Sequence, residues 1–165
     1  MTKASWNSIL MNLPMIMTQT DTSIQTGNVM ADAVLNSKLS VAEQKSIQLN
    51  VKAHIPKGIE MTDVEMCSVL GNLLDNAIEA CEKLPCDKRF LRVYIDKFKG
   101  QFYLSVQNSS PSIQRDKGIF RTTKAGTHGF GLFRIDRIAK KYGGYVNRQY
   151  EEGVFATELL LPLSG

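Results

Sequence analysis

The stretch LGNLLDNAIEA at residues 70–80 decides how the middle of this 165-residue chain folds. Its apolar residues recur at intervals of three and four, which predicts an amphipathic helix. Thr62 and Glu65 predict its start, because threonine followed three residues later by glutamate is the pattern of a capping box. Asn72 and Asn76 fall on the polar side, although asparagine is a mediocre helix former. A solvated polar face explains either asparagine alone, but the pair indicates a functional reason.

A second stretch, THGFGL at residues 127–132, lies further along the chain. Its glycines allow close backbone approach, and we expect the next helix to begin after Gly131 with N–H groups that can bind an anion. Taken alone, the stretch can equally be a plain junction between a loop and a helix. The amide oxygen of Asn76 suits Mg²⁺, which shares its ligand shell with phosphate oxygens and water. The two stretches together predict a magnesium nucleotide site.

The remaining segments predict further helices and strands. Residues 22–46 have helical apolar spacing and predict one helix that needs a packing partner. Alternating apolar residues predict strands at 47–55, 91–95, 102–106, 145–150 and 154–161. Residues 108–126 lack periodicity and predict a long functional loop. The helix after Gly131 is expected to end at Gly143 and Gly144.

Composition limits the classes of function. A length of 165 residues with 43% hydrophobic content predicts one core. The net charge is +4, but the basic residues are scattered, so we expect no nucleic-acid partner. Three cysteines without metal-like spacing predict free thiols in a reducing compartment. No apolar run approaches the ~18 residues that span a bilayer. We therefore expect a cytoplasmic fragment without membrane contact.

The two motifs resemble a known superfamily. NLLDNAIEA resembles the N box, and HGFGL followed by RIDRIAKKYGG resembles the G2 box, of the Bergerat-fold (GHKL) ATP-binding proteins, which include gyrase, heat-shock chaperones, sensor histidine kinases and MutL. With TGNVMADAVLNSK upstream, the chain is similar to histidine kinases, and more narrowly to their peptide quorum-sensing, AgrC-like branch. The resemblance implies an α+β fold: a two-layer α/β sandwich whose mixed sheet of about five strands carries helices on one face, plus an N-terminal helix.

The resemblance also implies a domain division and a ligand set. Residues 1–46 would be a remnant of a helical dimerisation or linker region, and residues 47–165 would be the ATP-binding catalytic domain. Asn76 would hold Mg²⁺, and Asn108 would accept a hydrogen bond from adenine where the family has an aspartate, a weaker bond because the amide is neutral. The implied ATP-binding residues are Asn72, Asn76, Glu79, Asn108, Ser110, Lys124, His128, Gly129, Phe130, Gly131 and Leu132.

The loop before the glycine stretch has an implied role as well. Residues 109–128 would form a lid that closes over the nucleotide. Lys124, together with Asn72, would contact the phosphates. Arg121 could also screen phosphate charge, although a solvated basic loop explains either cation alone.

Asn72 also separates kinases from hydrolases within the superfamily. Hydrolysing members have at this position a glutamate that activates water. Asn72 cannot act in this way, so the resemblance favours phosphotransfer by a two-component sensor histidine kinase. No catalytic residue is assigned in the chain.

The phosphoacceptor is expected outside this chain. Neither His54 nor His128 lies on the lead-in helix. The implied partners are a phosphoacceptor helix and a response regulator, within a full-length protein that is dimeric and membrane-anchored. The alternatives are a degenerate Bergerat-fold interaction module and an anti-sigma-type serine kinase on the same fold.

Overall fold

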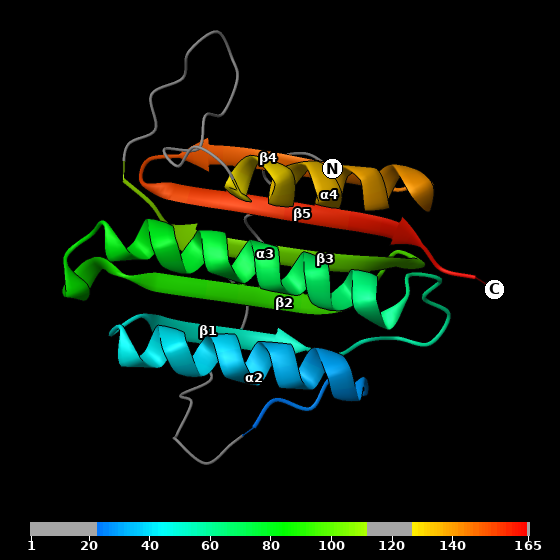
Figure 1. The fold of residues 1–165 in the computed structure, drawn as a ribbon, viewed down its shortest axis with the longest axis horizontal. Coiled ribbons are helices and arrows are strands. Elements are labelled where there is room, and N and C mark those ends of the chain that lie inside the picture. Colours follow the sequence, from blue (N-terminus) through cyan, green and yellow to red (C-terminus); the bar gives the residue numbers. More distant parts are fainter. Residues whose placement is uncertain (1–22, 112–126, 165) are drawn as a thin grey trace, which may run out of the picture.

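The computed structural model describes residues 23–111 and 127–164, where one five-stranded sheet carries three α-helices on a single face (Figure 1). The strand order is β1-β2-β3-β5-β4; β1 is parallel to β2 and the other pairs are antiparallel. This architecture confirms the predicted α+β sandwich with a mixed sheet. The elements are α2 (Val29–Gln44), β1 (Gln48–Ala53), α3 (Asp63–Glu82), η1 (Cys86–Lys88), β2 (Phe90–Phe98), β3 (Gln101–Ser109), α4 (Thr127–Lys141), β4 (Tyr145–Glu151) and β5 (Val154–Pro162).

The central helix α3 begins as its sequence predicts. The Thr62 hydroxyl accepts from the Glu65 N–H at 3.1 Å, and the Glu65 carboxylate accepts from the Thr62 N–H at 3.1 Å. This reciprocal capping box satisfies two donors at the helix start. The apolar stripe then packs on the sheet, with buried residues Met66, Val69, Leu70, Leu73, Leu74, Ala77, Ile78 and Cys81.

Helix α2 begins at Val29, later than the predicted start at residue 22. Gly27 has φ +100°, which a helix cannot accommodate, and the Asn28 side chain caps the first turn by accepting from the Ala31 N–H at 3.0 Å. The predicted domain division at residue 46 stays a prediction about the longer protein. In this chain α2 packs into the same core as the sheet through Ala31, Leu35, Leu39 and Ala42.

Strand β3 extends further than predicted. Asn108, which we expected in a loop, pairs with Leu91 of β2 and Phe155 of β5. Ser109 continues the pairing with Val154. Because a central strand has partners on both sides, its backbone hydrogen bonds outweigh the weak strand preference of Asn and Ser. Asn108 therefore belongs to the rigid sheet.

Helix α4 begins at Thr127, before the predicted start after Gly131. The glycine motif thus forms its first turns, where packing overrides the low helix propensity of glycine. Its end is as predicted: Gly143 has φ +72°, and a Cβ on Gly144 would lie 1.9 Å from the Leu160 carbonyl oxygen. The two glycines therefore allow the backbone between α4 and β4 to lie against the backbone of β5 at Leu160.

A buried polar network lies on the sheet face opposite the helices. Alternation along β3 places Phe102, Leu104 and Val106 in the core and turns Tyr103 to the other face. The Tyr103 hydroxyl donates to Glu158 Oε2 at 2.7 Å, and Asn147 Nδ2 donates to Oε1 at 3.0 Å. Both carboxylate oxygens of Glu158 are therefore hydrogen-bonded, although the residue is only 2% exposed.

Candidate nucleotide site

The polar face of α3 forms the middle of the candidate site. Asn72, Asn76 and Glu79 are all half-buried, whereas Leu73 and Ala77 beside them are buried in the core. Asn72 is oriented in part by Ser68, whose hydroxyl lies 3.4 Å from Asn72 Nδ2. The helix therefore presents a short row of amide and carboxylate side chains that a ligand can reach.

The glycine motif of α4 lies directly against this row. A Cβ on Gly131 would lie 3.0 Å from Asn72 Oδ1 and 3.1 Å from Asn72 Cγ. Such distances leave no room for a larger residue unless Asn72 moves. The structure thus brings together the two stretches that the sequence paired.

The end of β3 meets the sheet-facing side of α3 at Cys81. The Cys81 sulfur lies 3.3 Å from the Phe90 carbonyl oxygen, 3.5 Å from Ser109 Oγ and 3.7 Å from the Ser109 carbonyl oxygen, and its S–H can donate to one of these oxygens. Burial raises the pKa of the Cys81 thiol, so it acts as a neutral packing group. Ser109 follows Asn108, so the predicted adenine acceptor lies near the C-terminal half of α3.

Asn108 is buried on the same face of the sheet as the helices. It lies two residues beyond Val106 and thus on the helix-covered face of β3. The residue is 3% exposed, and its Nδ2 donates to the Ser109 carbonyl at 3.0 Å. With its nitrogen engaged in this way, Oδ1 is the atom left to accept a hydrogen bond from a ligand.

The donor set on α3 suits magnesium in a nucleotide complex. Among residues 23–111 and 131–164, no group of three or more His, Cys, Asp or Glu side chains could hold a metal ion. Mg²⁺ needs no such cage when it takes most of its ligands from phosphates and water. One amide oxygen from Asn76 is consistent with that mode of binding.

The other predicted site residues are described to different extents. Ser110 is buried; its N–H donates to the Gly153 carbonyl at 2.7 Å and its hydroxyl to the Pro111 carbonyl at 3.2 Å. Leu132 is half-buried on α4. Lys124, Arg121 and residues 112–126 of the predicted lid lie outside the described residues. His128, Gly129 and Phe130 fall in the first turn of α4, and their side chains also lie outside the described part.

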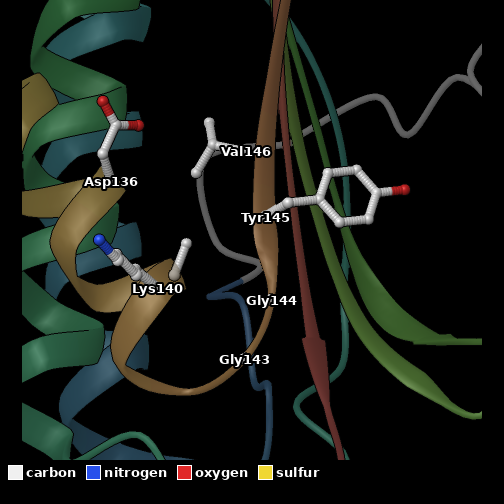
Figure 2. Close-up of a pocket in the computed structure, with 7 residues that line it drawn as sticks. Asp136, Lys140, Gly143, Gly144, Tyr145 and Val146 are labelled. Carbon is white, nitrogen blue, oxygen red and sulfur yellow. The ribbon is translucent and has the colours of Figure 1, made fainter.

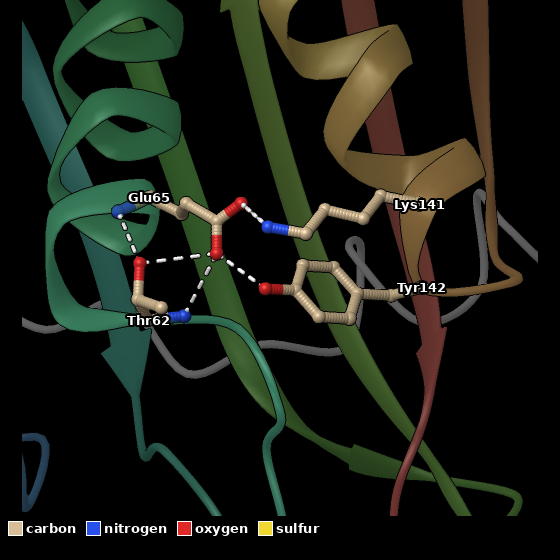
Figure 3. A network of polar contacts seen from close by, with 4 residues as sticks. All are labelled: Thr62, Glu65, Lys141 and Tyr142. Carbon is tan, nitrogen blue, oxygen red and sulfur yellow. Dashed lines mark hydrogen bonds and ion pairs between the residues drawn. The ribbon is translucent and has the colours of Figure 1, made fainter.

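A polar network that the sequence did not predict joins the far ends of α3 and α4 (Figure 3). Glu65 accepts from Lys141 Nζ at 3.0 Å and from the Tyr142 hydroxyl. Burial acts to raise the pKa of Glu65, but hydrogen bonds from Tyr142, Thr62 and Lys141 outweigh it and hold the pKa at about 2. From the sequence, Glu65 was predicted only to cap its own helix. Lys141 and Tyr142 are 76 and 77 positions further along the chain, and no local pattern in the sequence connects them with Glu65.

A hollow of about 430 Å³ lies between the end of α4 and β4 (Figure 2). Asp136 and Lys140 border it from α4, whereas the Tyr145 ring points to the other side of the sheet. None of the residues that line the hollow is a predicted nucleotide-binding residue, so the hollow is separate from the candidate site.

Comparison with known proteins decides the family. The sequence model of the GHKL domain matches residues 60–162, which include α3, β3 and α4. The chain belongs to the GHKL domain family. This membership fits the superfamily resemblance of the two motifs.

Several sensor kinases are similar to this GHKL chain in sequence. The chain is 23% identical to the sensor histidine kinase NatK of Bacillus subtilis, over 97% of this chain and 52% of NatK. It is 29% identical to the sensor histidine kinase DcuS of Escherichia coli, over 65% of this chain and 20% of DcuS. The chain thus spans about half or less of the length of these curated relatives. They do not confirm the quorum-sensing branch, which stays a prediction.

Solved catalytic domains of histidine kinases share the fold. The nucleotide-free catalytic domain of ThkA aligns with a TM-score of 0.65 and 21% identity, over 85% of this chain and 94% of that domain. The mycobacterial sensor histidine kinase MprB aligns with a TM-score of 0.62 and 18% identity, over 82% of this chain and 94% of that chain.

Within the described residues, no helix is long and apolar enough to cross a bilayer.

Proposed function

We propose that this chain binds Mg·ATP and acts as the catalytic domain of a two-component sensor histidine kinase. The observation that carries the proposal is that Gly131 of the glycine stretch lies against Asn72 on the polar face of α3. Asn76 follows Asn72 on the same face of α3, and Asn108 lies next to Ser109, whose hydroxyl is close to Cys81 on the sheet-facing side of the same helix. We infer from these positions one ligand site where α3, α4 and the end of β3 come together.

Each group in the proposed site has a chemical task. Asn76 would hold Mg²⁺, which when bound screens the phosphate charge. Asn72 would contact the phosphates, and Glu79 would lie beside the metal ligand. Asn108 Oδ1 would accept from the adenine amino group, and the N–H groups at the start of α4 would bind phosphate oxygens. Without a carboxylate at position 72 to activate water, the bound nucleotide is kept for phosphotransfer.

The receiving histidine is proposed to lie on a separate helix. His54 follows edge strand β1, and its Nδ1 lies 3.3 Å from Asp96 Oδ1, away from α3's polar face. The natural partners would then be a phosphoacceptor helix and a response regulator, as the similarity to sensor histidine kinases suggests. The dimeric, membrane-anchored parent protein belongs to the same proposal.

Phosphate transfer tests the proposal directly. The chain is mixed with radiolabelled ATP, Mg²⁺ and a separate acceptor-helix protein, and wild type is compared with Asn76→Ala. Asp75→Asn is the matched control, because Asp75 is the neighbouring residue but pairs with Lys38 of α2 at 2.7 Å. We expect acid-labile label on the acceptor with wild type and Asp75→Asn, and none with Asn76→Ala.

Two results would contradict this function. The first is a thermal-shift titration in which millimolar Mg·ATP leaves the melting temperature of wild type unchanged, since a ligand of the native state must raise it. The second is acid-stable label, which indicates phosphoserine and a serine kinase. Binding without transfer to any acceptor would favour the interaction module.

A further inference from the structure

We propose that Glu65, Lys141 and Tyr142 form a clamp that positions α4 against α3 and thereby sets the affinity for nucleotide. The inference rests on the proposed function, because α3 and α4 carry the two motifs of the proposed ATP site. In this proposal Lys141 and Tyr142 are positioning residues that do not touch the ligand.

One carboxylate makes all the contacts of the clamp (Figure 3). Glu65 Oε2 accepts from Lys141 Nζ at 3.0 Å, and Oε1 accepts from the Tyr142 hydroxyl. Thr62 donates to the same Oε1 from its N–H at 3.1 Å and its hydroxyl at 3.0 Å. The capping box therefore fixes Glu65 on α3, and the fixed carboxylate holds the end of α4.

The described part of α4, residues 131–141, buries few apolar side chains. Among its described residues only Ile135, Ile138 and Ala139 bury apolar side chains, whereas α3 buries eight. Because the hydrophobic contribution grows with buried apolar area, the position of α4 depends more than that of α3 on polar contacts at its ends. At one end Gly131 lies against Asn72, and at the other end lies the clamp.

The position of α4 matters for a phosphate ligand. The N–H groups in its first turn lie on one helix, while Asn72 and Asn76 lie on the other. Hydrogen bonds weaken steeply when the donor moves a few tenths of an ångström or tilts. If the clamped end of α4 is released, the helix can pivot about the Gly131 contact, and the two sets of ligand groups no longer match one nucleotide.

The test separates the clamp from the capping box. The double variant Lys141→Met/Tyr142→Phe keeps the apolar part of both side chains. It removes the ammonium group and the hydroxyl that donate to Glu65 from the end of α4. Thr62→Ala, the matched control, removes the hydroxyl that accepts from the Glu65 N–H and donates to the Glu65 carboxylate, but it leaves the backbone N–H of residue 62, Lys141 and Tyr142 on that carboxylate. Binding of a fluorescent ATP analogue with Mg²⁺ and the melting temperature are measured for each full chain.

We expect the double variant to bind the analogue about tenfold more weakly, which corresponds to roughly 1.4 kcal/mol of binding free energy. Thr62→Ala should lower the melting temperature with little change in affinity. Lys141→Arg should bind as wild type, because arginine can still donate to Glu65. If the double variant does not fold, the two single variants are compared, and each should weaken binding by a smaller factor.

Three outcomes would overturn the clamp. If wild type binds and the double variant, or both singles, bind equally well, the clamp is wrong while the proposed function stands. If affinity falls in Thr62→Ala as much as in the double variant, the network has only a structural role. If wild type itself does not bind, the proposed function fails and the clamp fails with it.

Discussion

A Cβ atom on Gly131 would lie 3.0 Å from Asn72 Oδ1, so glycine at this position lets α4 lie against the polar face of α3. The two residues come from the two motifs that the sequence paired. Their contact explains the glycine better than backbone freedom does, since Gly131 lies inside a regular helix.

Gly131→Ala should therefore weaken nucleotide binding more than it changes stability. The added methyl group must displace Asn72 from the proposed phosphate site. Alanine also gains about 1 kcal/mol of helix propensity, which offsets part of the crowding. We expect Mg·ATP affinity to fall several-fold, measured by isothermal titration calorimetry, with a small change in melting temperature.

Gly71→Ala is the matched control for this change. Gly71 precedes Asn72 in α3, but a Cβ there would meet nothing within 4 Å. This variant should be stabilised by up to about 1 kcal/mol and bind nucleotide as wild type does. Equal affinities of the Gly131 and Gly71 variants would show that the Asn72 contact has no effect on the site.

Asn108→Asp should destabilise the fold, although aspartate is the usual residue in the superfamily that the sequence resembles. In this chain Asn108 Nδ2 donates to the Ser109 carbonyl, and a carboxylate there would lose that bond and face the carbonyl oxygen while buried. We expect a loss of about 2 kcal/mol in the free energy of unfolding, measured with urea. The control is Gln107→Glu, the same change one residue away, where Arg92 Nη1 lies 3.3 Å from Gln107 Oε1 and favours a carboxylate. The prediction is wrong if the two variants are equally stable.

Acid should weaken the Glu65 network over a defined pH range. The folded pKa of Glu65 is about 2, against an ordinary value of 4.5. Because the pKa of Glu65 is lower in the folded than in the unfolded protein, the ionised carboxylate stabilises the folded state. This stabilisation is complete above pH 4.5 and is lost as the pH falls toward 2. The difference in unfolding free energy between wild type and Glu65→Gln should therefore shrink over this range in urea titrations. A difference that does not vary with pH would contradict the pKa.

Tyr103→Phe should be costly because it removes a donor from a buried carboxylate. Burial and the hydrogen bond to Glu158 raise the pKa of Tyr103, so its hydroxyl stays protonated and keeps donating. Removing it should cost about 2 kcal/mol of unfolding free energy. Tyr94→Phe, on the ring 5.9 Å away, is the control and should cost less. Adding Glu158→Gln to Tyr103→Phe should recover stability; no recovery would show that the loss comes from packing.

The sequence alone predicted the features that depend on neighbouring residues. The capping box at Thr62 and Glu65 and the apolar stripe of α3 follow from spacing along one helix, and the structure confirms both. The strands follow from alternation, and the mixed sheet follows from the superfamily resemblance. Boundaries were less accurate, as the starts of α2 and α4 and the end of β3 show, because packing and strand pairing outweigh local propensity there.

Only the tertiary structure decided which parts of these elements meet. Asn72 and Gly131, Cys81 and Ser109, and Glu65 and Tyr142 are each joined across long stretches of chain. Such contacts depend on the order of the strands and on how the helices pack over the sheet. The periodicity of a sequence predicts a helix or a strand, but it predicts neither of these two arrangements. The sequence thus determined the fold class and the two motifs, whereas the sheet order and helix packing set the distance between the motifs and placed Glu65 beside Lys141 and Tyr142.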